Sequence, residues 1–240
     1  MSDTIREQIL SAIEDRLATI LQAAGYNTDV GADVYRAFLV PLEFDNIPAI
    51  GFLPGDETLV RHHGCMAEYD WQMTFQAVDQ YGNELASVAG EKLYADVLES
   101  VFGIEYSLGY DSGGTQVIAV GDTIEGADSG AQAIVGGVSL DTGAWLDSDA
   151  AGSLSLRRLI GTFADNENLN IGVETNVATV DGSMTGTGAV ANLTDGLGES
   201  LNFISGGMQF PDSDQLTVGV SLIISIKYKS IVGNPYSQET

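Results

Sequence analysis

The side chains best suited to bind a transition metal lie in one short stretch of the sequence. His62, His63 and Cys65 stand close together, and the chain contains no other histidine or cysteine. A zinc site needs four ligands, so an Asp or Glu, or a second subunit, would have to complete it. We therefore interpret the stretch as a polar turn that leads into a strand, and we expect no metal and no cofactor. A lone cysteine also excludes an intrachain disulfide.

Two loops concentrate acidic and amide side chains that could bind calcium, which takes six to eight oxygen ligands. One loop contains Asp141, Asp147 and Asp149, and the other runs from Asp165 to Asn168 and includes Glu167. Neither matches the EF-hand spacing or the Gly/Asp nonapeptide repeat. We interpret both as solvated turns, with calcium binding as the alternative.

No combination of residues indicates catalysis. Neither histidine lies near a G-x-S-x-G pattern, and the sequence contains no Gly-Lys-Ser or Gly-Lys-Thr, so it lacks a phosphate loop of the Walker type. Arg157 and Arg158 form an isolated basic pair, which we interpret as a local salt-bridge partner. We predict that the protein is not an enzyme and has no catalytic, metal or cofactor-binding residues.

The composition is strongly acidic. Asp and Glu number 34 against 9 Lys and Arg, which gives a net charge of -25 among 240 residues. Such a surface repels nucleic acid and anionic membranes, so we expect neither as a bound partner. The charge either serves solubility or lines a passage through which DNA slides. No N-terminal apolar signal and no run of about 18 apolar residues is present, which predicts synthesis in the cytoplasm.

The stretch Leu216–Tyr228 predicts a long strand that needs a covering layer. Large apolar residues occupy one parity and mostly small or polar residues the other, with Ile223 as the exception. Amphipathic helices predicted over residues 3–24 and 83–102 could supply that layer. Further strands are predicted over 34–40, 47–53, 66–78 and 201–210, the last forming a hairpin with the final strand across the loop 211–214. The tail 233–238 is predicted to be mobile or bound to a partner.

The middle of the chain has a different texture. From about Asp111, Gly, Ser, Thr, Asp and Asn dominate, and no helix is expected before residue 197. Short apolar pieces at 116–120, 131–135, 153–156 and 177–180 predict a small all-β module. The stretch that begins at Asp122 aligns weakly with the one that begins at Glu167, which suggests a duplicated unit.

These elements predict an α+β fold. Its core has the order α-β-β-β-α-β-β, with the sheet covered by two helices, and is formed by residues 1–110 and 198–240. Residues 111–197 are predicted to be an inserted all-β module, because insertions are tolerated where chain ends lie close together and exposed.

The two outer segments resemble the tail terminator or tail completion proteins of long-tailed bacteriophages. The resemblance is carried by IREQILSAIEDRLATIL, AGYNTDVGADVYRA and IPAIGFLPGDE near the start, by the helix Leu85–Phe102, and by LNFISGGMQFP and VGVSLIISIKYKSIVGNPYSQ at the end. The ending departs from relatives that carry Gly-Asp-Pro where this chain has Gly-Asn-Pro. The middle segment also departs from a minimal terminator and looks like Gly/Thr-rich β modules of other virion proteins.

The resemblance implies a virion protein of the tail or neck, made in the host cytoplasm. It implies a homohexameric ring on the head-proximal end of the tail tube. The ring would stop tube growth, contact the tube protein and the head-completion or connector protein, and let DNA pass its lumen without specific binding. Two alternatives remain open. One is a tail tube or decoration protein, and the other is an adhesin-like module that binds calcium or glycans.

Overall fold

A computed structural model describes residues 3–37, 39, 47–114, 116–210 and 216–238. The chain folds into two units. Unit 1 comprises Met1–Leu21, Asn27–Phe102 and Ala189–Thr240, whereas unit 2 comprises Gln22–Tyr26 and Gly103–Gly188. Strands predominate over helices in the described residues, and the predicted α+β class is confirmed.

Unit 1 is built on a five-stranded sheet of order β1-β2-β3-β11-β10. A short strand β1 (Val34–Arg36) runs parallel to β2 (Ala49–His63), and all other pairs are antiparallel. The remaining strands are β3 (Met66–Gln80), β10 (Gly198–Gln209) and β11 (Thr217–Ile231). The strand predicted over 47–53 is much longer in the structure, and its pairing with β3 has a register shift between Pro54 and Glu57.

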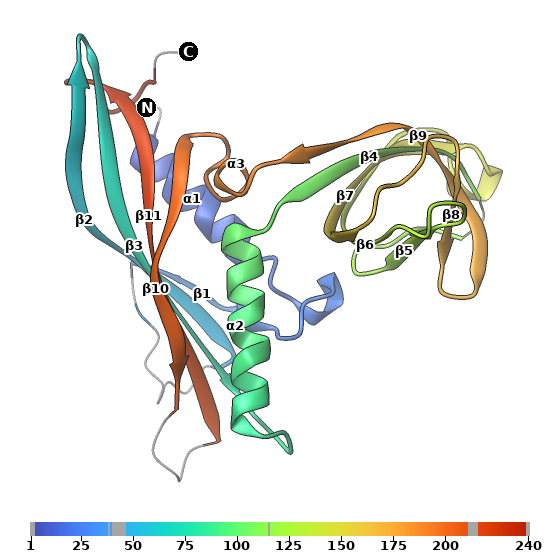
Figure 1. The fold of residues 1–240 in the computed structure, drawn as a ribbon, viewed down its shortest axis with the longest axis horizontal. Coiled ribbons are helices and arrows are strands. Elements are labelled where there is room, and N and C mark those ends of the chain that lie inside the picture. The colour runs from blue at the N-terminus through green and yellow to red at the C-terminus, as the bar shows by residue number, and fades with distance from the viewer. Residues whose placement is uncertain (1–2, 38, 40–46, 115, 211–215, 239–240) are drawn as a thin grey trace. The chain divides into compact units, whose positions relative to one another are not determined.

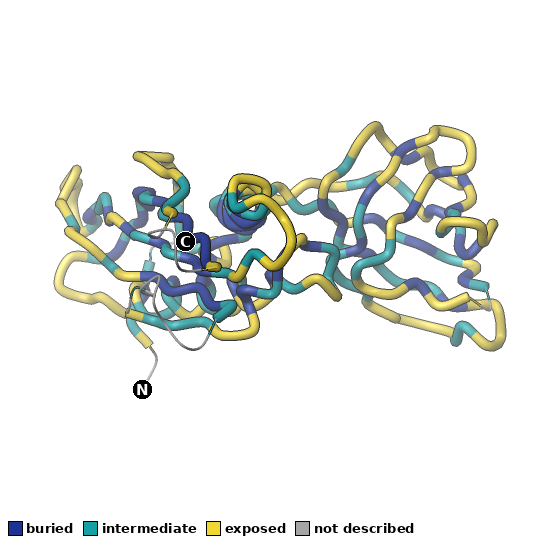
Figure 2. Tube along the Cα trace, turned by 90° about the horizontal axis from the view of Figure 1, so that it is seen from below, coloured by how far each residue is buried: buried dark blue, intermediate teal, exposed yellow. Residues whose placement is uncertain are grey.

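Strand β11 lies between β3 and β10, and it pairs with β3 along its whole length. Its alternation follows the sequence pattern, because one face is buried and the other carries small or polar residues. In Figure 2 the buried stretches of the chain lie inside each unit, whereas exposed segments lie at its surface. The buried side chains on that face of β11 are Val218, Val220, Leu222, Ile224, Ile226 and Tyr228.

Three helices cover this apolar face of the sheet, and all three lie on the same side of it (Figure 1). Helix α1 (Ile5–Leu17) begins at Thr4, whose Oγ1 accepts a hydrogen bond from the Glu7 N–H at 3.1 Å. The helix ends earlier than the predicted residue 24. After α1 the chain makes a tight turn, in which the Ile20 N–H donates to the Leu17 carbonyl. The Ile20 carbonyl in turn accepts a hydrogen bond from the Gly31 N–H.

Helix α2 (Ala86–Phe102) carries a buried acid that the apolar pattern does not reveal. Asp96 is fully buried, and its carboxylate accepts hydrogen bonds from the backbone N–H groups of Asn27 and Thr28. The Asn27 amide and the Thr28 hydroxyl donate to the same carboxylate at 2.7 and 2.8 Å. Asp96 thus fixes the segment Asn27–Thr28 against α2.

A third helix, α3 (Ala189–Thr194), lies in a segment that was expected to contain none, so that expectation is wrong. It contacts α1, α2 and β10, and it buries Leu193 and Thr194. One and a half turns give too short a window for helical periodicity to appear in the sequence.

Unit 2 is a closed barrel of order β4-β7-β6-β5-β8-β9. The strands are β4 (Glu105–Gly113), β5 (Thr123–Gly126), β6 (Gln132–Thr142), β7 (Ala150–Ile160), β8 (Asn168–Ile171) and β9 (Glu174–Thr187). Apolar side chains from all six strands fill the interior. The strand predicted over 116–120 is wrong, because these residues form a loop that only buries Ile118.

The two stretches that align in the sequence form two hairpins, β5–β6 and β8–β9. Strands β5 and β8 pair with each other, so the hairpins meet within the barrel. Glu167, next to β8, holds this arrangement through hydrogen bonds to the loop between β5 and β6.

The units divide at different residues from those predicted. Strand β4 begins at Glu105, before the expected boundary at 111, because it pairs with β7 and β9. Helix α3 follows Gly188 and packs within unit 1, although the predicted module extended to 197. Unit 2 also includes Gln22–Tyr26, a segment far earlier in the chain, so it is not formed by one continuous insertion.

The tail 233–238, predicted to be mobile or bound to a partner, is held by hydrogen bonds to its own chain. The Pro235 carbonyl accepts from the Ile5 N–H, the first of α1, at 2.9 Å. Gln238 donates to the Leu197 carbonyl, and the Ile231 N–H donates to the Ser237 carbonyl. We call residues 232–238 the C-terminal strap. The loop predicted over 211–214 lies outside the described residues.

Candidate assembly interface

The histidines and the cysteine of the sequence lie at the tip of the β2–β3 hairpin. His62 and His63 end β2, Cys65 lies in the turn, and all three are exposed. The Cys65 carbonyl accepts a hydrogen bond from the Val232 N–H of the C-terminal strap at 2.7 Å. Among the residues that the structure describes, no group of three His, Cys, Asp or Glu side chains could hold a metal ion.

Several acidic side chains of unit 2 accept hydrogen bonds from loop or strand residues of the same unit. Asp149 accepts from the Ala144 N–H at 2.8 Å, and Asp165 accepts from the Gly182 N–H at 2.9 Å. Glu167 is buried and accepts four hydrogen bonds. Burial alone raises the pKa of Glu167, but the bonds from Ser129, Ala164 and Asp128 outweigh it and hold this pKa below its usual range.

Arg157 is buried in unit 2 and binds the early segment of the chain. Its guanidinium lies 3.9 Å from the centre of the Tyr26 ring and donates to the Ala24 carbonyl. Gly121 has a φ of +92° and approaches the same segment so closely that a Cβ atom would lie 2.3 Å from the Ala23 carbonyl oxygen. Arg157 is therefore the residue that anchors Gln22–Tyr26, a role that its isolated position in the sequence did not reveal.

The sheet of unit 1 has two open edges. On one side, β10 pairs with β11, and no described residue pairs with its outer edge. On the other side, β1 covers β2 only from Ile50 to Phe52, and among the described residues nothing else pairs with that edge of β2. Long open edges offer unpaired N–H and carbonyl groups, to which another strand can bind.

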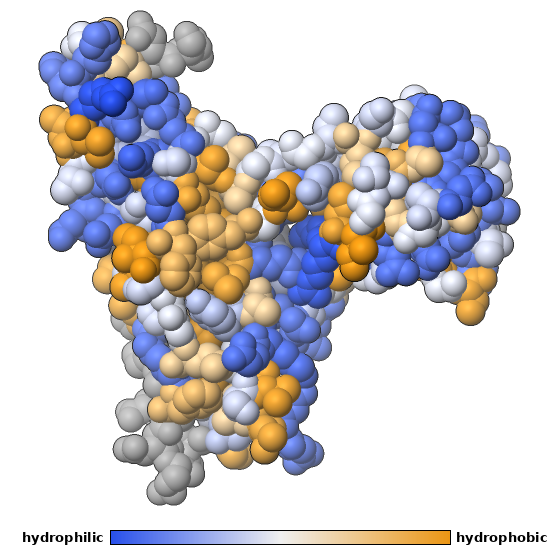
Figure 3. Space-filling model, viewed as in Figure 1, coloured by the Kyte–Doolittle hydropathy of each residue, from blue (hydrophilic) through white to orange (hydrophobic). Residues whose placement is uncertain are grey.

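Beyond Glu199 at its start, the β10 edge carries no charge and exposes apolar side chains. Between Ser200 and Phe210 the sequence holds no charged residue. Phe203 and Ile204 are about half exposed, at 51% and 46%, and Figure 3 shows apolar side chains gathered on unit 1 around this strand. Natural edge strands usually carry charges that prevent pairing, and β10 carries only Glu199, at its start.

The face of the sheet opposite the helices is polar, and no described helix covers it (Figure 1). Gln72, Thr74 and Gln76 of β3 lie opposite Ser225, Ile223 and Ser221 of β11. Further along, Lys227 lies opposite Asp70 and Lys229 lies opposite Glu68, and Lys229 forms an ion pair with Glu199 of β10. This face is therefore close to neutral, whereas the whole chain carries -25.

The hairpin tip differs from the rest of the chain in its charge. Arg61, His62 and His63 are consecutive and exposed, in a protein with only 9 Lys and Arg. Leu59 and Val60, just before them, are 59% and 48% exposed. We call residues 59–63 the hairpin end. A mixed apolar and basic patch of this kind is typical of protein interfaces.

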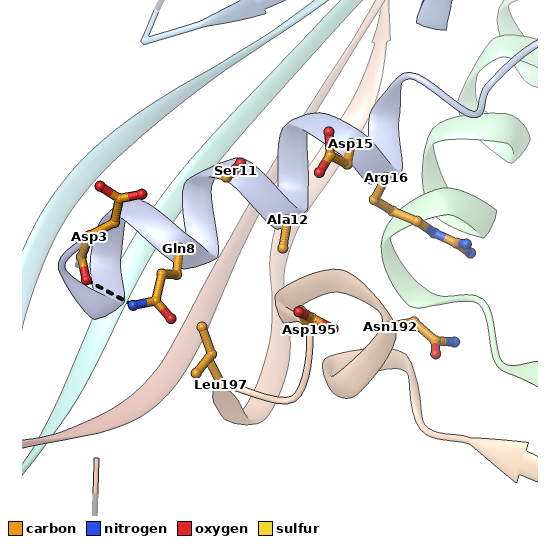
Figure 4. A pocket seen from close by; sticks show the side chains of 9 residues that line it. All are labelled: Asp3, Gln8, Ser11, Ala12, Asp15, Arg16, Asn192, Asp195 and Leu197. Carbon is orange, nitrogen blue, oxygen red and sulfur yellow. Dashed lines mark hydrogen bonds between the residues drawn. The ribbon is translucent and has the colours of Figure 1, made fainter. Parts of the chain in front are cut away.

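A groove of about 560 Å³ lies between α1 and α3. One side of the groove is lined by Asp3, just before α1, and by Asp15 of α1. The other side is lined by Asp195, just after α3 (Figure 4). All three carboxylates are exposed. Arg16 also lines the groove, but its Nε donates to the Ser100 carbonyl of α2 at 3.0 Å. We call this feature the acidic groove. The sequence did not indicate it, because it depends on α3.

The chain matches no known protein-family model, and no curated protein shows significant similarity to it. Within the described residues, no helix is long and apolar enough to cross a membrane.

Proposed function

We propose that the protein is a structural subunit of a bacteriophage tail. In this proposal it forms a closed ring at the head-proximal end of the tail tube, ends tube growth and joins the tail to the neck. The partners are the tube protein on one side and a head-completion or connector protein on the other. The proposal rests on the resemblance of the outer segments, and the order α1, β1, β2, β3, α2, β10, β11 in unit 1 is compatible with the core that the resemblance implies.

The observation that carries the proposal is the sheet of unit 1, which has helices on one face and two open edges. If the β10 edge of one copy pairs with the free part of β2 in the next, every copy uses two different edges. Such heterologous contacts generate a ring when the rotation closes. The exposed apolar side chains on β10 favour this arrangement over an isolated subunit.

The polar face then supplies the lumen through which DNA passes. Amides and hydroxyls predominate at its centre, and Lys227 and Lys229 each lie opposite a carboxylate. Because carboxylates lie beside these cations, the surface would hold a passing duplex weakly. The charges on this face therefore favour a near-neutral lumen for DNA, rather than the strongly acidic lumen that the composition suggested.

The calcium- or glycan-binding alternative has less support. The best-placed carboxylates of unit 2 are already engaged in loop hydrogen bonds, as Asp149, Asp165 and Glu167 illustrate. Unit 2 is better interpreted as a decoration of the ring, with the fully exposed Val173 at a hairpin tip available for contacts.

The test is the mass of the purified protein in solution. We expect a single species of about six copies, by analogy with closed rings. Ile204→Lys places a charge on the β10 edge and should shift the population toward the monomer. Val173→Lys, an equivalent change at a hairpin tip of unit 2, should leave the mass unchanged. A strict monomer at high concentration that does not associate with tail tubes would overturn the proposal.

A further inference from the structure

We infer that the hairpin end of one copy docks into the acidic groove of the next copy. The inference rests on the proposed ring, because it requires copies that lie side by side. It goes further by naming the two patches that meet and the charges that hold them. The occupant of the groove is thus a second copy of this chain, and its contact group is Arg61.

Charge complementarity is the first argument. Arg61 makes no ion pair with the described residues of its own chain, and neither do Asp3, Asp15 and Asp195. The groove holds three exposed carboxylates, and the hairpin end contains the only run of three consecutive basic residues in the sequence. Arginine donates in a planar fork that binds carboxylates well, and it is enriched at interfaces.

The hairpin end and the acidic groove also lie at the same height along the strands of the sheet. Leu59 of β2 lies opposite Tyr69 of β3, Tyr69 lies opposite Tyr228 of β11, and Tyr228 lies opposite Gly198 of β10. The hairpin end and the start of β10 are therefore on one row across the sheet, at its two open edges. Asp195 and Leu197 of the groove immediately precede that start.

This placement is what a closed ring needs. Copies related by a rotation without a rise must present complementary patches at the same height on their two sides. Edge pairing of β10 with the next copy's β2 would bring the hairpin end to the level of the groove. The exposed Leu59 and Val60 would supply apolar contact area beside the charges, and Leu197 would supply it in the groove.

The contact predicts a strong dependence on salt and on the sign of the charges. Arg61→Glu and Asp195→Arg should each weaken association of the chain at least about tenfold, the size expected for a close charge pair. Lys92→Glu, the same charge change on the exposed side of α2, should leave association unchanged. Thermal unfolding of each variant verifies that it is folded, and Asp15→Arg replaces Asp195→Arg if the latter is not.

Mixing the two variants gives the decisive measurement. Each copy of Arg61→Glu keeps an intact groove, and each copy of Asp195→Arg keeps an intact hairpin end. In an equimolar mixture the native pair and the reversed pair can both form, so we expect sedimentation to show ring-sized species again. Two misfolded variants could not rescue each other in this way.

The outcomes separate this inference from the proposed function. Rings that form normally in both single variants would overturn the docking contact and leave the ring intact. Variants that are both defective and do not recover on mixing would show that the patches do not meet each other, and would also overturn it. A wild-type chain that stays monomeric overturns the ring and the contact together.

Discussion

The carboxylate of Glu167 binds Ser129 at two points. One oxygen accepts from the Ser129 backbone N–H at 2.9 Å, and the other accepts from its hydroxyl at 2.8 Å. The two residues lie in different loops of the barrel, and Glu167 is almost fully buried. This pair therefore ties the loop before β8 to the loop before β6 in unit 2.

The first prediction follows from the charge of that carboxylate. Glu167→Gln should lower the free energy of unfolding of unit 2 by about 3 kcal/mol, since an amide cannot accept all four hydrogen bonds and its NH₂ group faces donors. Urea unfolding at neutral pH measures the loss.

The same residue predicts the direction of a pH effect. The pKa of Glu167 is lowered in the folded state, so its contribution is present above the ordinary glutamate value of 4.5 and is lost as the pH falls through the lower folded value. The difference in unfolding free energy between wild type and Glu167→Gln should therefore shrink as the pH falls below 4.5. A difference that stays constant down to full unfolding would contradict the assignment.

A second prediction concerns Asp96 of α2. Asp96→Ala removes the acceptor for the Asn27 and Thr28 N–H groups, and should destabilise unit 1 by about 3 kcal/mol because the Thr28 N–H and hydroxyl stay buried. Glu91→Ala, on the exposed side of the same helix, should change stability by less than about 0.5 kcal/mol. Equal effects of the two substitutions on the urea midpoint would contradict the role given to Asp96.

The third prediction concerns the segment held by Arg157. Arg157→Lys loses the planar contact with Tyr26 and should reduce the stability of unit 2 by about 2 kcal/mol. The neighbouring Arg158 is exposed, so Arg158→Lys is the matched control and should be nearly neutral. Limited proteolysis should cut residues 22–26 faster in Arg157→Lys. Unchanged protection of that segment would count against the anchor.

A fourth prediction tests whether unit 1 folds by itself. Replacing residues 103–188 with a Gly/Ser linker of about 8 residues keeps α3 and should give one cooperative unfolding transition. Removing 111–197, the module predicted from the sequence, also deletes α3 and exposes the apolar side chains beneath it. That shorter chain should be clearly less stable, and loss of cooperative melting in both chains would refute an independent unit 1.

The strands and helices with long regular patterns were predictable from sequence. Alternation over Met66–Val78 and over Leu216–Tyr228 reflects a sheet with one buried face, and the apolar steps of Ile5, Ile9 and Ile13 reflect a helix on that sheet. These patterns persist because each element buries one face only.

Features that depend on distant partners were not predictable in the same way. Asp96 is polar within an apolar stripe, and its partners at Asn27 and Thr28 come from another part of the chain. Arg157 likewise binds Ala24 and Tyr26 far away in the sequence. The acidic groove required α3, which is too short to produce a periodic signal, so the candidate interface emerged only from the fold.

The most direct test of the ring is an image of the purified protein mixed with tail tubes. We predict closed rings of one size, each on a single end of a tube, and tubes that no longer lengthen when more tube protein is added. Tubes that keep growing, with both ends bare and the protein dispersed as single copies, would contradict the account.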